Sequence, residues 1–307
     1  MSKILSIALN PAIDISSDAE VVRHTHKTRT HNQRQHAGGG GINVARVIVE
    51  LGGHCELLYL SGGPTGTLIE AMLKPLGVTQ HRFPIHDPVR VAYNVRELST
   101  NLEYRFVPEG PLVTEEELAP VFDLLETSDA DYVVASGSLP RGVAQDTYAR
   151  MAEIAARKQA RFILDTSGEA LHETLAKSKV FLVKPSLGEL ASFVGGRLDQ
   201  ENAGAAAQSI VRSGAVDYIA VTLGADGAIL VGADGIRRVP AIDVPVQSAV
   251  GAGDSFVAAM TWSLAEGHEI DEAFRFGLAA GAAAVMTSGT ELCRQADVLS
   301  LYAANTS

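Results

Sequence analysis

The chain has few cysteines, no long uninterrupted apolar run and no excess of positive charge. Only Cys55 and Cys293 occur among 307 residues. With neither a paired framework nor metal-ligand spacing, they are expected to be reduced thiols rather than a disulfide scaffold or a zinc site. The apolar stretches at residues 4–9 and 276–286 are too short for a signal peptide or a membrane span. These features predict a cytoplasmic protein.

The charge balance and the glycine spacing exclude further classes of binding protein. A formal net charge of −11 argues against general binding of nucleic acid or of an anionic membrane. A small anionic ligand would need a local group of cations, so individual arginines and lysines become informative. No Gly-Lys-Ser/Thr P-loop occurs, and the glycines around residue 40 do not have the spacing of a dinucleotide fingerprint.

From residue 112 onward, short apolar strands alternate with amphipathic helices. We expect strands at 132–135, 161–166, 180–185 and 218–224, separated by helices at 115–125, 145–158, 171–177 and 203–212. Two more helices are expected at 255–266 and 270–287. This rhythm is typical of a parallel sheet that is covered by helices on both faces.

Two earlier segments depart from this rhythm. Residues 89–107 alternate with a period of two around a turn at 99–101, which predicts an antiparallel hairpin and hence a small separate sheet such as a lid. Residues 21–37 are polar and rich in histidine, which suits an exposed strand. Their four histidines match no set of metal ligands. A buried strand at 4–9 is expected to end in a loop that carries Asp14.

Two glycine-rich turns, each followed by a helical pattern, are the candidate binding sites. In the first, Gly251-Ala252-Gly253 precedes Asp254. Unpaired N–H groups at the start of a helix stabilise the charge of a phosphoryl group. The helix end is expected to keep Asp254 ionised, so that it can accept a proton from an attacking alcohol. An aspartate that only caps its helix would show the same pattern.

The second turn, Gly38–Gly41, leads into the helical pattern of residues 44–51. Bare backbone there can lie against a polar ligand, and Asn43 offers an amide to its hydroxyls. Close packing of the helix is the alternative use of these glycines. Polar residues also follow the predicted strands: Ser138, Asp165, Lys184 and Thr222. Because ligands bind at the carboxyl edge of an open α/β sheet, we expect these residues on one rim with Asp254.

In combination and order, these motifs resemble those of the ribokinase/pfkB-like sugar kinases. The resemblance rests on Gly38–Asn43, Lys184-Pro185, residues 221–227 and residues 250–256, and it covers essentially the whole chain. Within the family, the runs GGGGINVAR, SGSLP, DTSGEAL, VGAGDS and GT-x-LC are most similar to the minor, pfkB-type 6-phosphofructokinases.

The resemblance implies a three-layer α/β/α domain of residues 1–307 with a mostly parallel central sheet. A β-sheet lid, formed by about residues 11–37 and 88–109, would join two chains into a homodimer. The implied activity is transfer of a phosphoryl group from ATP, with Mg²⁺, to fructose 6-phosphate. Tagatose-6-phosphate kinase and 1-phosphofructokinase are the alternatives, and a sugar-phosphate-binding protein without catalysis is a more remote one.

The resemblance also implies a role for each matching residue. Asp254 would be the base, and Gly251, Ala252 and Gly253 the anion hole. Sugar hydroxyls would meet Asp14, Asn43 and the backbone of Gly38, Gly39, Gly40 and Gly41, while Lys27, Arg90 and Arg105 hold the sugar phosphate and Ser138 makes a further contact. The nucleotide would meet Lys184, Ser186, Thr222, Gly224, Gly227 and Ser248. Glu189 would bind Mg²⁺ through water, and carbonyls of Ser248, Val250 and Ala284 would bind K⁺.

Two positions depart from the family pattern. Ser186 stands where the family usually has asparagine, and its shorter side chain predicts a weaker or water-mediated contact with magnesium or phosphate. Glu291 stands where the most similar members have arginine. A potassium site built from backbone carbonyls would be little affected by that change.

Overall fold

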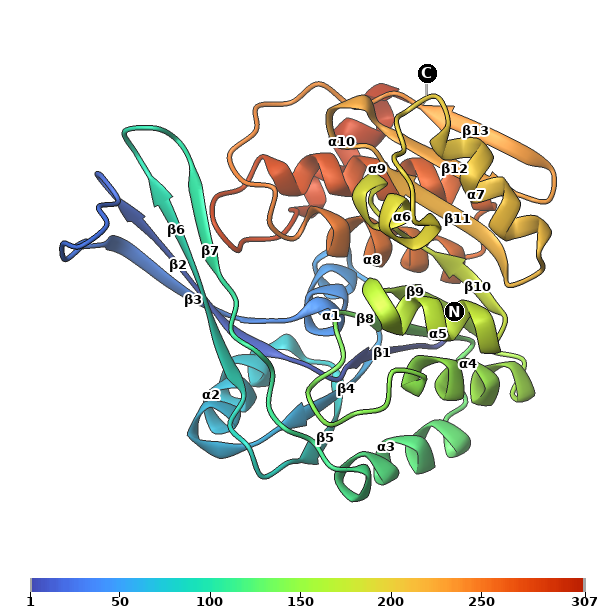
Figure 1. Cartoon of the computed structure of the whole chain (residues 1–307), viewed down its shortest axis with the longest axis horizontal. Helices are drawn as coiled ribbons and strands as arrows, with labels where there is room; N and C mark the ends of the chain where they lie inside the picture. The colour runs from blue at the N-terminus through green and yellow to red at the C-terminus, as the bar shows by residue number, and fades with distance from the viewer. Residues whose placement is uncertain (1, 306–307) are drawn as a thin grey trace.

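The computed structural model describes residues 2–305, in which a nine-stranded sheet lies between two layers of helices (Figure 1). The strands are β1 (Ile4–Ala8), β4 (Glu56–Ser61), β5 (Thr79–Pro84), β8 (Tyr132–Ser136), β9 (Arg161–Asp165), β10 (Val180–Val183), β11 (Val216–Thr222), β12 (Ala228–Gly232) and β13 (Gly235–Val239). Their order is β13-β12-β11-β10-β9-β8-β1-β4-β5. Only β12 and β13 pair antiparallel with their neighbours. The predicted three-layer, mostly parallel fold is therefore confirmed.

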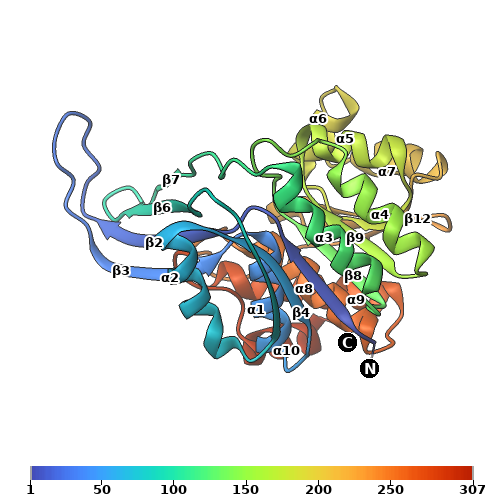
Figure 2. The same cartoon turned by 90° about the horizontal axis from the view of Figure 1, so that it is seen from below.

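Alternating side chains of β1 divide the interior into two cores. Ile4 and Ala8 pack on one face of the sheet, whereas Leu5 and Ile7 pack on the other. The first face is covered by α1 (Gly40–Glu50), α2 (Gly63–Leu73), α8 (Ala252–Ala265), α9 (Ile270–Val285) and α10 (Gln295–Asn305), and the second by α3 (Glu115–Thr127), α4 (Thr147–Arg157), α5 (Gly168–Lys177), α6 (Leu187–Val194) and α7 (Ala203–Arg212) (Figure 2). No helix of residues 2–305 is long and apolar enough to cross a bilayer.

A second, smaller sheet stands beside the large one. Its strands are β2 (Ala12–Ala19), β3 (His31–Gly38), β6 (Arg90–Glu97) and β7 (Glu103–Phe106), in the order β3-β2-β6-β7. We call it the small sheet. It extends away from the layered body, and the connection between β2 and β3 forms its far end (Figure 2). Since β2 follows β1 directly and β3 leads into α1, the small sheet is attached at the carboxyl edge of the large one.

The structure corrects several local expectations. Asp14 lies within β2 and not in a loop, because residues 12–19 pair with both β3 and β6. Only residues 31–38 of the predicted exposed strand are extended, while residues 20–30 form the connection. The sequence analysis did not foresee β5, α6, α10, β12 and β13. Of these, α6 has only eight residues and β5 is a partly exposed edge strand, so neither has a strong hydrophobic pattern.

Candidate active site

A cavity of about 170 Å³ lies between the small sheet and the carboxyl edge of the large sheet. Strands β2 and β6, the start of α1 and the start of α8 form its walls. Its lining includes Asp14, Gly39, Gly40, Asn43, Arg90, Asn94, Arg105, Val250, Gly251, Asp254 and Thr290. The structure thus brings together residues as far apart in the sequence as Asp14 and Thr290, and they include members of both predicted glycine turns and of the predicted hairpin.

The turn before α8 has the geometry of an anion site. Gly251 is the N-cap, with a φ of 77° that favours glycine. The first N–H groups of a helix have no partner inside the helix. Ala252 N makes a long bond of 3.5 Å to the Ala249 oxygen, so the N–H groups of Gly251 and Gly253 are the more available to a ligand. A positive charge lies beside them, since a Cβ placed on Gly253 would be 3.1 Å from Lys184 Nζ. A phosphoryl group at this turn can therefore be bound by backbone N–H groups and by the ammonium group of Lys184.

Asp254 is held by two hydrogen bonds in the first turn of α8. Asn43 Nδ2 donates to Oδ2 at 2.9 Å, and Ser136 Oγ donates to Oδ1 at 3.4 Å. Burial raises its pKa to about 6, aided by the negative charge of Asp165 and opposed by Asn43 and Lys184. The positive end of α8 therefore does not set the pKa of Asp254, contrary to our expectation. A carboxyl group with this pKa is still mostly ionised at neutral pH and suits a general base.

Asp14 faces the same cavity from β2. Gly38 leaves room for its carboxylate, because a Cβ on that glycine would lie 1.9 Å from Asp14 Oδ2. Burial raises the pKa of Asp14 to about 6 as well, opposed by the positive charges of Arg46, Arg90 and Arg105. Two carboxyl groups with raised pKa values thus share one cavity, an arrangement common at catalytic sites.

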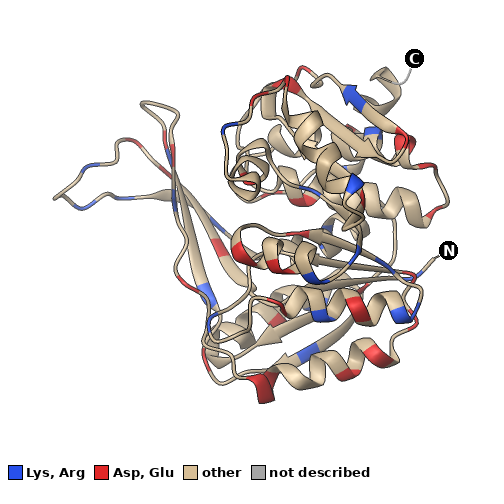
Figure 3. Ribbon diagram, turned by 45° about the vertical axis from the view of Figure 1, so that its right-hand side comes forward, with Lys and Arg blue, Asp and Glu red and all other residues tan. Residues whose placement is uncertain are grey.

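Two arginines supply positive charge on the small-sheet side. Arg90 donates to the backbone oxygens of Asn10 at 3.1 Å and Pro108 at 3.3 Å, while its Nε has no partner within residues 2–305. Arg105 makes no hydrogen bond or ion pair with any described residue. Lys and Arg are otherwise interspersed with Asp and Glu along the outer helices (Figure 3). An anionic group entering the cavity would find these two guanidinium groups ready to bind it.

The four glycines at residues 38–41 serve two purposes. Gly39 and Gly40 line the cavity. A Cβ on Gly41 would lie 2.2 Å from the Ile7 carbonyl oxygen, so this glycine permits α1 to approach β1 closely. Gly41 therefore serves the packing of α1, whereas ligand contact by Gly39 and Gly40 stays a prediction.

The nucleotide side of the predicted site begins at Lys184. Its ammonium group is 3.1 Å from Asp165 Oδ1, and both side chains are buried. Burial disfavours the charged lysine, but the attraction of Asp165 outweighs it and raises the pKa of Lys184. The lysine is therefore a fixed cation between β9 and the α8 turn.

Ser186 and Glu189 are bonded to each other in a capping box at the start of α6. Glu189 N donates to Ser186 Oγ at 3.2 Å, and Ser186 N donates to Glu189 Oε2 at 2.7 Å. Ser186 also lies next to Thr222, whose N–H donates to the Pro185 oxygen at 3.0 Å. Both side chains therefore cap α6, in addition to any contact with a ligand. This capping was not predicted from the sequence.

The remaining nucleotide and ion candidates lie on the turn after β11, in the segment before α8 and in the last turn of α9. Gly224 and Gly227 frame a tight turn after β11, where Gly227 N donates to the Gly224 oxygen at 3.2 Å. Ser248 lies against the end of α9, because Gln247 N donates to the Val285 oxygen at 2.7 Å. The Ala284 oxygen already accepts from Thr287 N and Oγ1.

Two predicted substrate residues lie apart from the cavity. Lys27 is exposed on the connection between β2 and β3. Ser138 is exposed and accepts a hydrogen bond from Asn10 Nδ2 at 3.1 Å. Ser136, two residues earlier, reaches Asp254 instead. As the last residue of β8 it fits the carboxyl-edge rule that we applied to Ser138. Arg46, which follows Asn43 by one helical turn, was also not predicted as a residue of the site.

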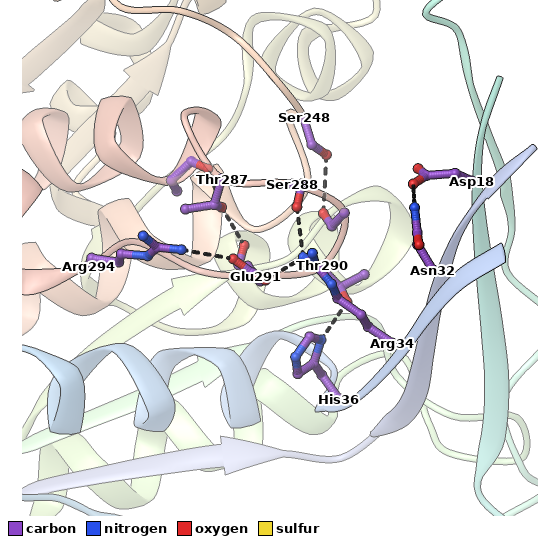
Figure 4. A network of polar contacts seen from close by, with 12 residues as sticks. Asp18, Asn32, Arg34, His36, Ser248, Thr287, Ser288, Thr290, Glu291 and Arg294 are labelled. Atoms are coloured by element: carbon purple, nitrogen blue, oxygen red, sulfur yellow. Dashed lines mark hydrogen bonds and ion pairs between the residues drawn. The ribbon is translucent and has the colours of Figure 1, made fainter. Parts of the chain in front are cut away.

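One loop connects the small sheet with the α8 turn. The α9–α10 loop, residues 286–294, is bonded to β3 through Arg34, which pairs with Glu291 and donates to Ser288 Oγ at 2.8 Å, and through His36, whose Nδ1 lies 2.8 Å from Thr290 Oγ1 (Figure 4). The same loop meets the α8 turn, since a Cβ on Gly251 would be 2.6 Å from Leu292 Cδ2. Thr290 itself lines the cavity.

The sequence of this chain is similar to those of several phosphofructokinases. The ATP-dependent 6-phosphofructokinase isozyme 2 of Mycobacterium tuberculosis is 42% identical over 299 residues, covering 96% of this chain and 88% of that protein. The isozyme 2 of Escherichia coli is 37% identical over 305 residues, covering 99% of each. The 1-phosphofructokinase of Bacillus subtilis is 30% identical over 292 residues, covering 94% and 95%.

Solved structures of a phosphofructokinase also match this chain over its whole length. Structures of Escherichia coli phosphofructokinase-2 match with TM-scores of 0.95 in complex with potassium, 0.94 with fructose-6-phosphate and 0.93 in a tetrameric inhibited form. Each covers 100% of both chains at 35% or 36% identity. A sequence model of the pfkB family carbohydrate kinases matches residues 1–297. This chain therefore belongs to the pfkB family of carbohydrate kinases, phosphotransferases that act on a sugar hydroxyl.

Proposed function

We propose that the protein is an ATP-dependent 6-phosphofructokinase, which converts fructose 6-phosphate and ATP to fructose 1,6-bisphosphate and ADP. The observation that carries the proposal is the cavity itself. Asp254 and the α8 turn lie at one side, and the unpartnered guanidinium group of Arg105 lies at the other. A sugar that already bears a phosphate can present its free primary hydroxyl to Asp254 while its phosphate binds the arginines.

In this proposal Asp254 accepts the proton of the attacking hydroxyl. The bond from Asn43 and the bond from Ser136 hold the carboxylate in place, and Asp14 and Asn43 bind neighbouring hydroxyls of the sugar. The N–H groups of Gly251, Ala252 and Gly253, with Lys184, stabilise the negative charge on the transferred phosphoryl group. Every one of these groups is fixed by the fold before the substrates bind, so little reorganisation accompanies the transfer.

ATP would enter along Lys184, Ser186 and Thr222, towards the turn of Gly224 and Gly227, with Ser248 close by. Mg²⁺ would neutralise the phosphates of ATP when bound. Glu189 is a fitting partner, because one carboxylate oxygen remains beyond the bond from Ser186 N. Within residues 2–305, no three His, Cys, Asp or Glu side chains lie together as a metal site. We also propose K⁺ near Ser248, Val250 and Ala284. The solved potassium complex of the Escherichia coli protein supports the binding of this ion in the family.

The test is ADP release from purified protein with a panel of sugars. We expect fructose 6-phosphate to give the highest kcat/KM, followed by tagatose 6-phosphate, with unphosphorylated fructose far lower because it leaves two arginines unpaired. Each sugar is measured with and without KCl at constant ionic strength. A higher kcat/KM for fructose 1-phosphate would favour the alternative below, and no ADP release with any sugar would leave only a binding function.

The second candidate is a 1-phosphofructokinase, which the Bacillus subtilis relative at 30% identity supports. The two reactions need the same base and the same anion hole, and they differ in which end of the sugar carries the first phosphate. Tagatose 6-phosphate differs from fructose 6-phosphate in the orientation of one hydroxyl. The higher identities to the two 6-phosphofructokinases are the reason for our order.

We further propose that the small sheet is a lid through which two chains form a homodimer. Tyr93 and Phe106 are paired across β6 and β7, and they are 49% and 59% exposed. A second copy of this sheet would cover such an apolar face. The solved tetrameric form of the Escherichia coli protein supports association in the family. Lys27, at the far end of the small sheet, would then be free to face the partner's cleft and its sugar phosphate.

Sedimentation velocity at micromolar concentration tests the dimer. The wild-type chain is expected to sediment as a dimer and the Phe106→Asp variant as a monomer, since the aspartate would bury a charge in the interface. Leu299→Asp, at another exposed apolar position, on α10, is the matched control and should remain dimeric. A monomeric wild-type chain, or a dimeric Phe106→Asp variant, would contradict the proposed interface.

A further inference from the structure

A short chain of hydrogen bonds runs from Arg46 to the proposed base. Arg46 Nη1 donates to Asn43 Oδ1 at 3.2 Å and to the Ala37 oxygen at 2.9 Å. Asn43 Nδ2 in turn donates to Asp254 Oδ2 at 2.9 Å. Arg46 and Asn43 are one turn apart on α1, so the helix sets their spacing. The bond to Ala37, at the end of β3, fixes the guanidinium group from a second element.

The direction of these bonds decides which way the Asn43 amide faces. An asparagine side chain has a donor end and an acceptor end. A guanidinium group can only donate, so it binds the oxygen and leaves the NH₂ group to face Asp254. If the amide turned round, its NH₂ would meet the guanidinium and its oxygen would meet the carboxylate. Protonation of Asp254 would relieve only the second of these contacts, because the NH₂ group and the guanidinium group are both donors.

We propose that Arg46 is a positioning residue of the phosphoryl transfer: it holds the Asn43 amide so that its NH₂ group faces Asp254, and its charge favours the ionised carboxylate. Arg46 does not line the cavity, so it acts through Asn43 and not on the sugar. This inference rests on the proposed role of Asp254 as the base.

The charges around Asp254 show why such support is needed. Asp165 on β9 and Asp14 on β2 are negative neighbours that disfavour its ionised form, as does burial. Lys184, after β10, opposes them but is already paired with Asp165. From α1 the supporting groups are the Asn43 amide and the charge of Arg46. Burial lowers the pKa of Arg46, and the attraction of Asp14 and Asp254 opposes that shift. Removing Arg46 would therefore shift the balance towards the protonated, inactive carboxyl group.

The test is the pH profile of kcat in Arg46→Gln, Arg46→Lys and the wild-type enzyme. In Arg46→Gln, the acid limb is expected to move to higher pH by about one unit or more, the size typical of losing a nearby opposite charge. The loss of kcat should be at least about tenfold at pH 6 and small at pH 9, with little change in the KM for the sugar. Arg46→Lys keeps the charge and should leave the limb near its wild-type position, at a lower plateau.

Arg157→Gln, which breaks an ion pair with Glu126 between α3 and α4, is the matched control and should leave the profile unchanged. An equal loss at every pH in Arg46→Gln, with an unmoved acid limb, would overturn the proposal and leave Arg46 a packing role. If Arg46→Gln does not fold, Arg46→Lys decides: a limb displaced as far as one unit despite the retained charge contradicts the proposal. Turnover retained in Asp254→Asn would instead defeat the proposed base, so the two failures are distinct.

Discussion

Replacing Asp254 by asparagine is expected to lower kcat by roughly 10²–10⁴-fold, the usual contribution of a positioned general base. The KM for the sugar phosphate should change little, because asparagine keeps the size of the side chain and the arginines are untouched. The measurement is steady-state ADP release at saturating ATP, together with calorimetric titration of fructose 6-phosphate. Near-normal turnover with an intact fold would remove Asp254 from the chemistry.

The pH dependence separates loss of the base from loss of the fold. In the wild type, kcat should fall as the pH drops through about 6, where Asp254 becomes protonated. Asp14 titrates in the same range, so the observed midpoint belongs to the pair. The pKa of Asp254 lies above its ordinary value of 3.8. The charged form therefore lowers stability above about pH 6, and that cost is relieved as pH falls. Asp254→Asn should accordingly keep or raise the Tm at pH 8.

Replacing Arg105 by alanine is expected to raise the KM for fructose 6-phosphate by about 10- to 100-fold, the equivalent of a charged hydrogen bond worth ~1.5–3 kcal/mol. The kcat at saturating sugar should be nearly unchanged, since Arg105 is distant from the α8 turn in the proposed pose. Because this guanidinium group bonds to no described residue, its removal leaves no buried partner unsatisfied. Arg90→Ala is a poorer test, since it would also release the Asn10 and Pro108 oxygens.

Selectivity for phosphorylated sugar is the decisive measurement for Arg105. The ratio of kcat/KM for fructose 6-phosphate to that for fructose should fall by the same factor, because fructose has no phosphate to lose a contact. Arg150→Ala, which removes an exposed arginine paired with Glu115, is the control and should leave the ratio unaltered. An equal loss of kcat/KM for both sugars would show that Arg105 stabilises the small sheet and does not bind the phosphate.

The layered fold was predictable because its signals are local and repeated. Apolar strands and amphipathic helices alternate from residue 112 to the end of β11, and each unit reinforces the next. The elements that escaped prediction lack that redundancy. In β2, the polar residues Asp14, Ser16, Ser17 and Asp18 conceal a strand whose order comes from pairing with β3 and β6. Such pairing is a property of the assembled sheet, which a local pattern does not encode.

The site was predictable where a residue's chemistry is tied to a turn, and less so where tertiary contacts set its role. Asp254, Asn43 and Gly251 follow from glycine-to-helix junctions and were found. The raised pKa of Asp254 depends on Asp165, which only the folded sheet places beside it. Ser186 illustrates the opposite case: its sequence context, Ser-x-x-Glu before a short helix, already contains the capping signal, although only a binding role was predicted for it.

The α9–α10 loop has a consequence for how this enzyme can diverge. Arg34 and Glu291 are more than 250 positions apart, yet each is the charged partner of the other, and the glutamate side chain is only 28% exposed. A lineage that loses Glu291 leaves Arg34 without its counterion, whereas one that loses Arg34 leaves Glu291 with Arg294 alone, at 3.4 Å, beside residues that shape the cavity. We expect residues 34 and 291 to change together among proteins descended from this chain, because their ion pair helps to set the distance between the small sheet and the large one.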